Sequence, residues 1–388
     1  MCAASCVFQM PELLCEMATF QHGTFNDLRQ FLAFDASAWD ATPFDRRLVV
    51  RMETMNTLLT PWLAAHSVRR LAALFEKLPQ LAPLVLETAV YYKQTTLVEH
   101  LCTHWHGLAA SRRAIDVAAW AGHLGLVELL HLRNFGGCST LALDYAARGG
   151  HLEIVRFLHG HRSEGCTTEA MNWAANRGFL DVVQFLHFNR SEGCTKEALN
   201  WSAGNGRMDV VRFLHEHRSE GGTEYAMNMA CYNGHLQMVV FLQENRTEGC
   251  NEWAMTWAAT QRHLDIVKYL HKHRSEGCGG HTLNWVAANG DMPMATFLLA
   301  HGYGGSKVEA LRHAARTGQL EMAAFLYEDG MNVQLALESA ALHGHIPLLE
   351  FLAPKRLHGD WTPVLNAAAE GNHPHVIAYL STLLDGSL

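Results

Sequence analysis

The sequence lacks the features that mark several large functional classes. Charged residues make up only 18% of the 388 residues, the formal net charge is −8, and no block of basic residues occurs. Proteins that bind nucleic acid concentrate Lys and Arg against the phosphates, so we expect no nucleic acid partner. No run of 18 apolar residues is present, so we also expect no transmembrane segment and no membrane partner.

The amino-terminal residues, MCAASCVFQMPELLCEM, lack the basic segment and long apolar core of a secretory signal peptide. We therefore expect a cytoplasmic or nuclear location, with reduced cysteines. Five of the ten cysteines recur at one position of a repeat: Cys138, Cys166, Cys194, Cys250 and Cys278. Packed helices lie about 8–10 Å apart, whereas a disulfide needs Cα atoms about 4.4–6.8 Å apart. Gly222 takes the same slot, which indicates a position for small side chains.

Catalytic motifs are also missing. The sequence has no G-x-S-x-G, no P-loop, no G-x-G-x-x-G that opens a helix after a strand, and no C-x-x-C pair. Ser, His and Asp occur mainly as repeated columns. We therefore predict that the protein is not an enzyme and uses no cofactor.

What the chain has instead is a repeat of 28 residues. A leucine recurs at this interval as the second member of the apolar pair that ends each unit: Leu130, Leu158, Leu186, Leu214, Leu242, Leu270, Leu298 and Leu326. A constant period of this kind is typical of a stacked array in which each unit contacts only its neighbours. It predicts a solenoid, which presents surfaces rather than a closed pocket.

The unit Thr167–Cys194 shows how one repeat folds. Thr167 is a good N-cap for a first helix, and Gly178 suits the left-handed residue that ends it. Asp181 falls in the first turn of a second helix, where the helix dipole favours an anion. Other repeats carry the same cap types at Ser139, Thr195, Thr223 and Asn251, and the same glycine at Gly122, Gly150, Gly206, Gly234, Gly290 and Gly318, with Arg262 as an exception. No strand period appears, so we predict an all-α fold of helix–turn–helix units.

These motifs resemble the ankyrin repeat. The family hallmark T-P-L-H-x-A-A is similar to Thr362–Ala368 (TPVLNAA), and its G-H-L turn is similar to Gly150–Leu152 and Gly234–Leu236. Ankyrin repeats usually span about 33 residues. The five residues missing here fall where the family places a β-hairpin finger, so we expect short or absent fingers.

The resemblance covers residues 86–388, read as an ankyrin-type solenoid of about ten clear repeats with a carboxy-terminal cap. Residues 1–85 are read as a degenerate helical amino-terminal cap or divergent repeats. Within them, residues 58–84 are helical in character, and we expect breaks at Pro61, Pro79 and Pro83.

The resemblance implies a non-catalytic protein–protein interaction scaffold or adaptor that binds a protein partner through the repeat surface. The alternative is a structural subunit of a large multiprotein assembly. The protein would accordingly be a monomer or a subunit of a hetero-assembly.

Binding specificity is expected where the repeats differ from one another, at the two positions after the alanine pair of the first helix. In ankyrin arrays these positions line the concave face. The candidate partner-binding residues are Arg148, Asn176, Arg177, Asn205, Tyr232, Asn233, Thr260, Gln261, Asn289 and Arg316.

Two further columns lie in the first helix. The aromatic column consists of Tyr145, Trp173, Trp201, Trp257 and Trp285, with Met229 between them. It is interpreted as packing between repeats or as an exposed binding stripe, and the exchange with Met229 favours packing. The polar column consists of Asp144, Asn172, Asn200, Asn228, Thr256 and Asn284. It replaces the family histidine and should connect neighbouring repeats by hydrogen bonds.

The second helix ends in His-x-His pairs at His159/His161, His215/His217 and His271/His273. Side chains two residues apart on a helix point away from each other, so these pairs do not predict a metal site. Beyond them, an arginine and a glutamate recur two residues apart, beginning with Arg162 and Glu164. We expect these to form a ladder of ion pairs between repeats, each worth about 0–1 kcal/mol.

Overall fold

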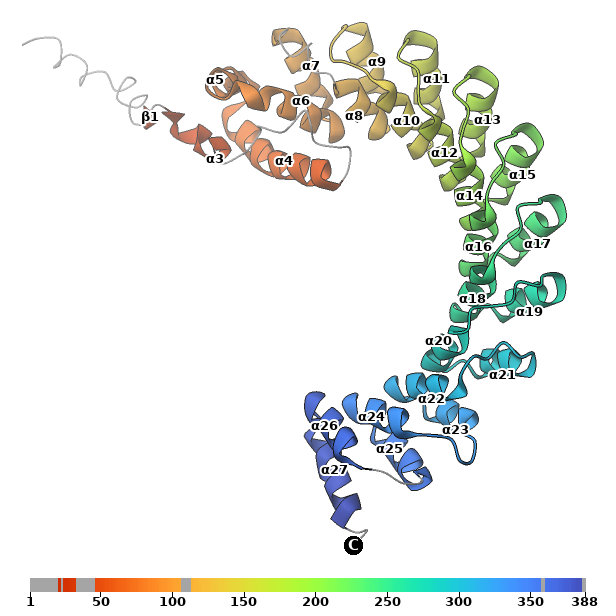
Figure 1. The fold of residues 1–388 in the computed structure, drawn as a ribbon. Coiled ribbons are helices and arrows are strands. Elements are labelled where there is room, and N and C mark those ends of the chain that lie inside the picture. The colour runs from red at the N-terminus through yellow and green to blue at the C-terminus, as the bar shows by residue number, and fades with distance from the viewer. Residues whose placement is uncertain (1–19, 22–23, 33–45, 106–112, 357–359, 386–388) are drawn as a thin grey trace, which may run out of the picture. The chain divides into compact units, whose positions relative to one another are not determined.

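The computed structural model describes residues 20–21, 24–32, 46–105, 113–356 and 360–385. The chain divides into two compact units, unit 1 at residues 1–194 and unit 2 at residues 195–388. In each unit, helices alternate between two rows (Figure 1). We call the first helix of each pair the A helix and the second the B helix.

Unit 1 contains four A–B pairs in its described part. They are α6 (Ala82–Tyr91) and α7 (Thr95–His104), α8 (Ala114–Trp120) and α9 (Leu124–Leu132), α10 (Thr140–Gly149) and α11 (Leu152–His161), and α12 (Thr168–Arg177) and α13 (Leu180–Asn189). Successive A helices pack on one another. The boundary that we placed at residue 86 falls inside α6, so the first regular pair begins at Ala82.

The elements before Ala82 are irregular. They are β1 (Phe20–Gln21), β2 (Thr24–Phe25), η1 (Asn26–Leu28), α3 (Arg29–Leu32), α4 (Arg46–His66), η2 (Val68–Arg70), α5 (Leu71–Lys77) and η3 (Pro79–Leu81). The two short strands pair antiparallel. Asp27 connects these elements, because its carboxylate accepts two hydrogen bonds from the Arg70 guanidinium at 3.0 Å and one from Trp62 Nε1 at 3.2 Å.

The expected break at Pro61 is wrong. Helix α4 continues through this residue to His66. Proline removes one backbone hydrogen bond from a helix, but the residues on either side, Leu59 and Trp62, are buried, and their burial offsets that loss. Pro79 begins η3, and Pro83 lies in the first turn of α6, where proline is tolerated.

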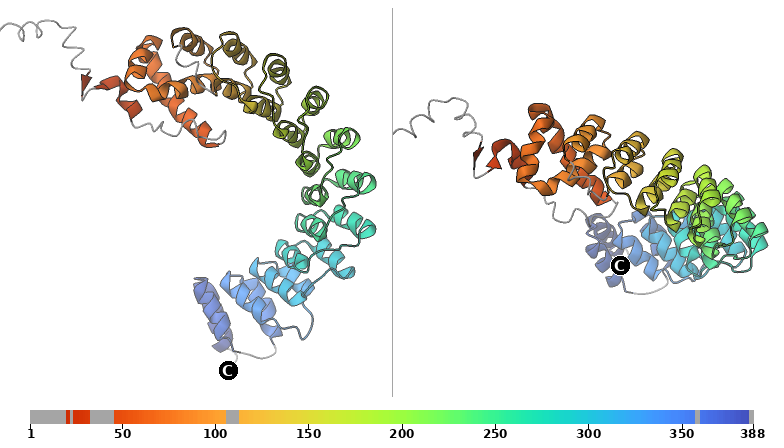
Figure 2. Two further views of the ribbon diagram at one scale, coloured as in Figure 1. Left: turned by 45° about the horizontal axis from the view of Figure 1, so that its top comes forward. Right: turned by 90° about the horizontal axis from the view of Figure 1, so that it is seen from above.

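Unit 2 contains seven pairs in its described part. They are α14 (Lys196–Gly204) and α15 (Met208–His217), α16 (Glu224–Tyr232) and α17 (Leu236–Asn245), α18 (Glu252–Thr260) and α19 (Leu264–His273), α20 (Thr282–Asn289) and α21 (Met292–Ala300), α22 (Lys307–Arg316) and α23 (Leu320–Leu326), α24 (Gln334–Leu342) and α25 (Ile346–Leu352) with η5 (Ala353–Lys355), and α26 (Thr362–Glu370) and α27 (Pro374–Asp385). The left view of Figure 2 shows the A helices α14–α20 as one row and the B helices α15–α21 as another.

The predicted caps form as expected. The Thr195 and Thr223 hydroxyls and the Asn251 amide oxygen each accept a hydrogen bond from the backbone N–H two residues later. Gly206 has φ of 69°, and a Cβ there would lie 2.9 Å from the His235 ring of the next repeat. Glycine is therefore favoured for its backbone conformation, although Arg262 adopts a φ of 68° at the same position of its repeat.

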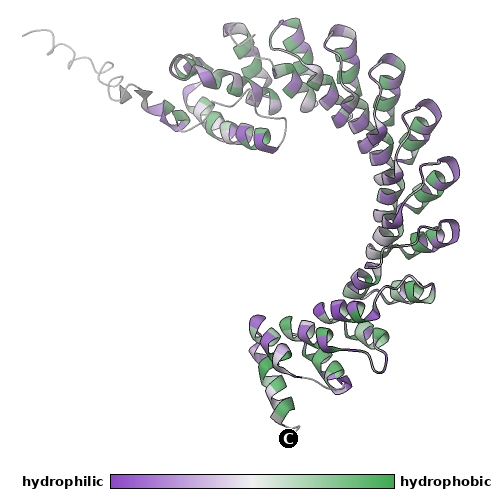
Figure 3. Ribbon diagram, viewed as in Figure 1, coloured by the Kyte–Doolittle hydropathy of each residue, from purple (hydrophilic) through white to green (hydrophobic). Residues whose placement is uncertain are grey.

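The core of each unit is a layer of small A-helix residues against larger B-helix residues. Ala203, Ala230 and Ala258 are fully buried, and so are Val211 and Val239 on the B helices that follow. Hydrophobic and hydrophilic residues alternate along both rows (Figure 3), as expected for helices with one face in the core and one in water.

The loops from a B helix to the next A helix are short. Residues 162–167 and 218–223 contain no strand, so these loops carry no β-hairpin fingers. The prediction of an all-α helix–turn–helix solenoid is confirmed, with β1 and β2 as the strands present in the described residues. Within those residues, no helix combines the length and apolarity needed to cross a bilayer.

Candidate protein-binding surface

The polar column holds neighbouring repeats together, as predicted. In unit 1, Asp144 accepts from the backbone N–H of Thr167 at 2.8 Å and from its hydroxyl at 2.9 Å. In unit 2, Asn200 Oδ1 accepts from the backbone N–H of Thr223 at 2.9 Å. Each buried side chain thus holds the residue that caps the next A helix.

Asp116 of α8 also belongs to this column. Its carboxylate accepts from the backbone N–H of Ser139 at 2.8 Å and from the Ser139 hydroxyl at 2.7 Å. Burial raises the pKa of Asp116 to about 6, although these hydrogen bonds and Arg113 act in the opposite direction. The pKa of Asp144 is likewise raised by burial.

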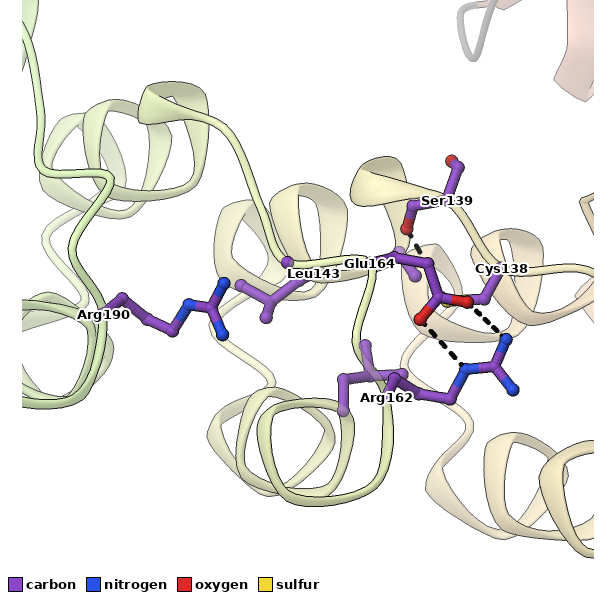
Figure 4. A pocket seen from close by; sticks show the side chains of 9 residues that line it. Cys138, Ser139, Leu143, Arg162, Glu164 and Arg190 are labelled. Carbon is purple, nitrogen blue, oxygen red and sulfur yellow. Dashed lines mark hydrogen bonds and ion pairs between the residues drawn. The ribbon is translucent and has the colours of Figure 1, made fainter.

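The ion pairs lie within loops rather than between repeats, which corrects the predicted ladder. Arg162 Nε donates to Glu164 Oε2 at 3.2 Å and Arg162 Nη2 donates to Glu164 Oε1 at 2.5 Å (Figure 4). The same pairing occurs at Arg190–Glu192, Arg218–Glu220, Arg246–Glu248 and Arg274–Glu276. A spacing of two residues lets both side chains of one turn meet.

The same glutamates still connect repeats, through the backbone. Glu192 accepts from the N–H of Cys166 at 3.2 Å, and Glu248 accepts from the N–H of Gly222 at 2.9 Å. Burial alone would raise the pKa of Glu192, but hydrogen bonds from Arg190 and from backbone N–H groups outweigh it and lower the pKa to about 2. These loops are therefore structural.

The two histidines of each His-x-His pair have different contacts. The His159 ring lies edge-on to Phe185 of the next repeat, at 5.4 Å between centroids. The His161 ring stacks on Phe157 of its own helix at 4.4 Å. The pairs at residues 215/217 and 271/273 repeat this division. Among the described residues, no group of three or more His, Cys, Asp or Glu side chains is placed to hold a metal ion.

Two hollows in the described part of the surface are small. One lies under the Arg162–Glu164 pair and is lined by Cys138, Ser139 and Leu143 (Figure 4). A matching hollow lies under the Arg246–Glu248 pair in unit 2. Burial raises the pKa of the Cys138 thiol to about 12, so it stays protonated and is a poor nucleophile. The described cysteines of the repeated position are free thiols.

The ten candidate partner-binding residues lie at the ends of the A helices, and several have a structural contact. Asn233 Nδ2 donates to the Gly204 carbonyl of the preceding repeat at 2.7 Å, and Asn289 Nδ2 donates to the Thr260 carbonyl at 3.0 Å. Asn205 Nδ2 donates within its own helix. These asparagines are exposed, but their amides already make hydrogen bonds within the stack.

Three of the ten have no such contact. The side chains of Arg177, Gln261 and Arg316 are exposed and make no side-chain hydrogen bond to any described residue. Together with Tyr232, which is 39% exposed, they are members of the predicted set that are open to a partner. Asn176 precedes Arg177 on α12 and is half-buried.

Some residues of the aromatic column pack between repeats, and others are exposed. Tyr145 is buried, with its ring 5.9 Å from Trp120 and 5.3 Å from Trp173. Trp201, Met229 and Trp257 are half-buried, whereas Trp285 is 39% exposed. The column is therefore buried at Tyr145 in unit 1, half-buried at Trp173, Trp201 and Trp257, and open to solvent at Trp285 in unit 2.

Sequence reasoning missed two exposed aromatic side chains beside this column. Tyr225 and Trp253 are 41% and 42% exposed, four residues before Met229 and Trp257 on the same helix faces. Other repeats have glutamate there, Glu169 and Glu197. The exchange of glutamate for an aromatic residue is a signal that the sequence did contain.

We call the resulting surface of unit 2 the aromatic patch and define it as Tyr225, Tyr232, Trp253, Trp257 and Trp285. It extends over α16, α18 and α20, which pack in this order. The Trp253 and Trp257 rings are 5.7 Å apart, and Tyr232 meets Trp257 edge-on at 6.0 Å.

Comparison with known protein families agrees with this geometry. A model described as ankyrin repeats (3 copies) matches residues 171–252, 199–279 and 255–336, and a model described as ankyrin repeats (many copies) matches residues 137–187. These matches extend over residues 137–336, which is more than half of the chain. The chain belongs to the ankyrin repeat family. No curated protein matches it.

Ankyrin repeats generally mediate protein–protein interactions and are typically non-catalytic. The small hollows and the extended row of A helices are compatible with that general role.

Proposed function

We propose that the protein is a non-catalytic scaffold or adaptor that binds a protein partner through the exposed face of its A helices. The observation that carries this proposal is the aromatic patch. Its tryptophans Trp253 and Trp285 are 42% and 39% exposed, and Tyr225 and Tyr232 are about equally open. Adjoining exposed aromatic side chains are typical of binding surfaces, because their burial supplies much of the affinity of an interface.

The packing of the repeats does not depend on these exposed rings. The repeats are already held by buried alanines, by the polar column and by the arginine–glutamate loops. Gln261 and Arg316 are further exposed side chains at the ends of A helices in unit 2, and Arg177 has the same kind of position in unit 1. Exposed side chains that differ between repeats, on a constant framework, suit the recognition of one particular partner.

The test is affinity capture from a native lysate with three forms of the full chain. The first is wild type, and the second replaces the exposed residues Tyr225, Trp253 and Gln261 of the A-helix side of unit 2 with alanine. The third is a matched control on the B helices, in which the exposed residues Glu216, Gln237 and Lys272 are replaced with alanine.

We expect a partner that the wild type and the B-helix control both retain and the A-helix variant loses. Quantitative mass spectrometry of the captured material measures this. Equal retention by all three forms, or loss in the B-helix control alone, would contradict binding through the A-helix face.

A further inference from the structure

One cation of the chain already lies over the aromatic column in unit 1. The Arg148 guanidinium carbon is 5.8 Å from the centroid of the Tyr145 ring and 5.3 Å from that of the Trp173 ring. Arg148 follows Tyr145 by three residues and precedes Trp173 by 25. It thus bridges the rings of two consecutive repeats, within the distance at which a cation and a ring face attract.

The same place is open in unit 2. Thr260 follows Trp257 by three residues and precedes Trp285 by 25. Its backbone therefore has the same position in its repeat that Arg148 has in the repeat of unit 1. The short Thr260 side chain bonds only to its own helix, donating to the Trp257 carbonyl at 3.0 Å. Among the described residues, no arginine or lysine lies over a ring of the aromatic patch.

The three helices that carry the patch have acidic side chains and no basic ones. Helices α16, α18 and α20 contain two charged residues, Glu224 and Glu252, and both carboxylates are exposed in the first turns. Neither arginine nor lysine occurs in these three helices. Arg262 lies beyond the end of α18, and its guanidinium donates to the Asn289 carbonyl.

We propose that the aromatic patch binds an arginine side chain of a peptide segment in the partner, with the guanidinium between Trp257 and Trp285 above Thr260. This inference rests on the proposed function and specifies the chemistry of the partner. The partner's arginine takes in unit 2 the place that Arg148 takes in unit 1.

Arginine fits this place better than lysine. Its planar guanidinium stacks on aromatic faces and is more weakly hydrated than an ammonium group. Trp253 and Tyr232 extend the aromatic surface on the amino-terminal side of the array. The carboxylates of Glu224 and Glu252 border the patch, where they attract further basic residues of the same segment.

The experiment selects peptides on the full chain from a random twelve-residue library displayed on phage. The strongest binder is then synthesised in three forms: unchanged, with each arginine replaced by citrulline, and with each arginine replaced by lysine. Titration calorimetry gives the dissociation constants. Citrulline keeps the shape of arginine without its charge. We expect the citrulline form to bind at least about tenfold more weakly and the lysine form several-fold more weakly.

A protein variant tests the location. Thr260→Arg places the chain's own cation over Trp257 and Trp285, so the arginine peptide should bind at least about tenfold more weakly. Gln237→Arg adds the same charge on the B helix α17 and should leave binding within about twofold. Trp285→Ser removes one wall of the site and should weaken binding as Thr260→Arg does. Circular dichroism and thermal unfolding check that each variant is folded.

The outcomes separate the two proposals. Selected peptides without arginine, citrulline peptides that bind equally well, or equal affinity for Thr260→Arg and wild type would each overturn the arginine site. If such peptides nevertheless lose binding when Tyr225, Trp253 and Gln261 are replaced with alanine, the interaction face stands and only its chemistry is different. A library that yields no binder also counts against the arginine site.

Discussion

The A helices of the two units share one framework and differ in how they cover their aromatic residues. In unit 1, Arg148 of α10 lies over Tyr145 and Trp173, and Tyr145 is buried. In unit 2, the corresponding position of α18 is Thr260, and Trp285 is 39% exposed. The difference is that the chain supplies its own cation to this pair of rings in unit 1 and a short neutral side chain at the corresponding position of unit 2.

A second difference lies beneath this surface, in the polar column. Two repeats of unit 1 use carboxylates, Asp116 and Asp144, whereas α12 of unit 1 has Asn172 and unit 2 uses Asn200, Asn228 and Thr256. An amide and a carboxylate both accept the hydrogen bond from the next cap. Only the carboxylate makes the free energy of unfolding depend on pH, because burial raises its pKa.

The largest expected effect is therefore a dependence of local stability on pH. The pKa of Asp116 in the folded chain, about 6, is above its value of about 3.8 in an unfolded chain. Its contribution to stability is fully present below about pH 4 and is lost as the pH rises through about 6. Between pH 4 and pH 7 we expect α8 and α10 to lose about 2 kcal/mol of local stability relative to an Asp116→Asn variant.

Hydrogen exchange read by mass spectrometry, corrected for intrinsic rates, measures this loss. Helices α14 and α16 are the internal control, because Asn200 and Asn228 do not titrate. An equal pH dependence of α10 in the wild type and in Asp116→Asn would contradict the assignment.

The next effect compares two tryptophans. Trp173→Ser in unit 1 should lower the free energy of unfolding by about 2 kcal/mol, since the ring is half-buried between Tyr145 and Arg148. Trp253→Ser in the aromatic patch should cost about 1 kcal/mol or less, because that ring is 42% exposed. Urea unfolding followed by circular dichroism provides both values. A larger loss for Trp253 than for Trp173 would mean that the patch is part of the core.

Removal of the covering cation should make unit 1 resemble unit 2. Arg148→Ala loses a cation–π contact with two rings, worth about 1 kcal/mol. Acrylamide should then quench the fluorescence of Trp173 more strongly, measured in a chain whose other tryptophans are replaced by phenylalanine. Arg177→Ala is the matched control, because Arg177 is exposed on α12. Unchanged quenching after Arg148→Ala would contradict the covering role.

The smallest effect is the reverse change. Thr260→Arg should stabilise unit 2 by about 0.5 kcal/mol through a new cation–π contact at an exposed site. It should also lower the exposure of Trp257 and Trp285 to acrylamide. Thr260→Gln, which has a long neutral side chain, separates the charge from the added bulk. A destabilised Thr260→Arg chain would show that the two positions are not equivalent.

Much of the fold followed from local signals. The 28-residue period, the Thr223 cap and Gly206 defined the helix pairs, because caps and left-handed turns depend on residues close in sequence. The polar column was also predictable from its repetition. Pro61 was misjudged, since burial at Leu59 and Trp62 depends on distant parts of the chain.

The candidate site was predicted only in part. The pattern of variable residues found Arg177, Gln261 and Arg316, which are open, but also Asn233 and Asn289, whose amides bind the preceding repeat. Exposure alone did not separate these groups, because a side chain at a helix end reaches either solvent or the neighbouring carbonyl. Tyr225 and Trp253 were missed because they lie one turn before the column that was followed.

The sequence by itself determined the class of fold, the length of the repeat and the absence of fingers, because each follows from patterns within one unit. Only the tertiary structure decided which partners the side chains take. It put Arg162 on Glu164 of its own loop, Asn289 on the carbonyl of Thr260, and Arg148 over Trp173 of the next repeat. These contacts depend on the distance between neighbouring repeats, and that distance is set by how closely their buried alanines pack.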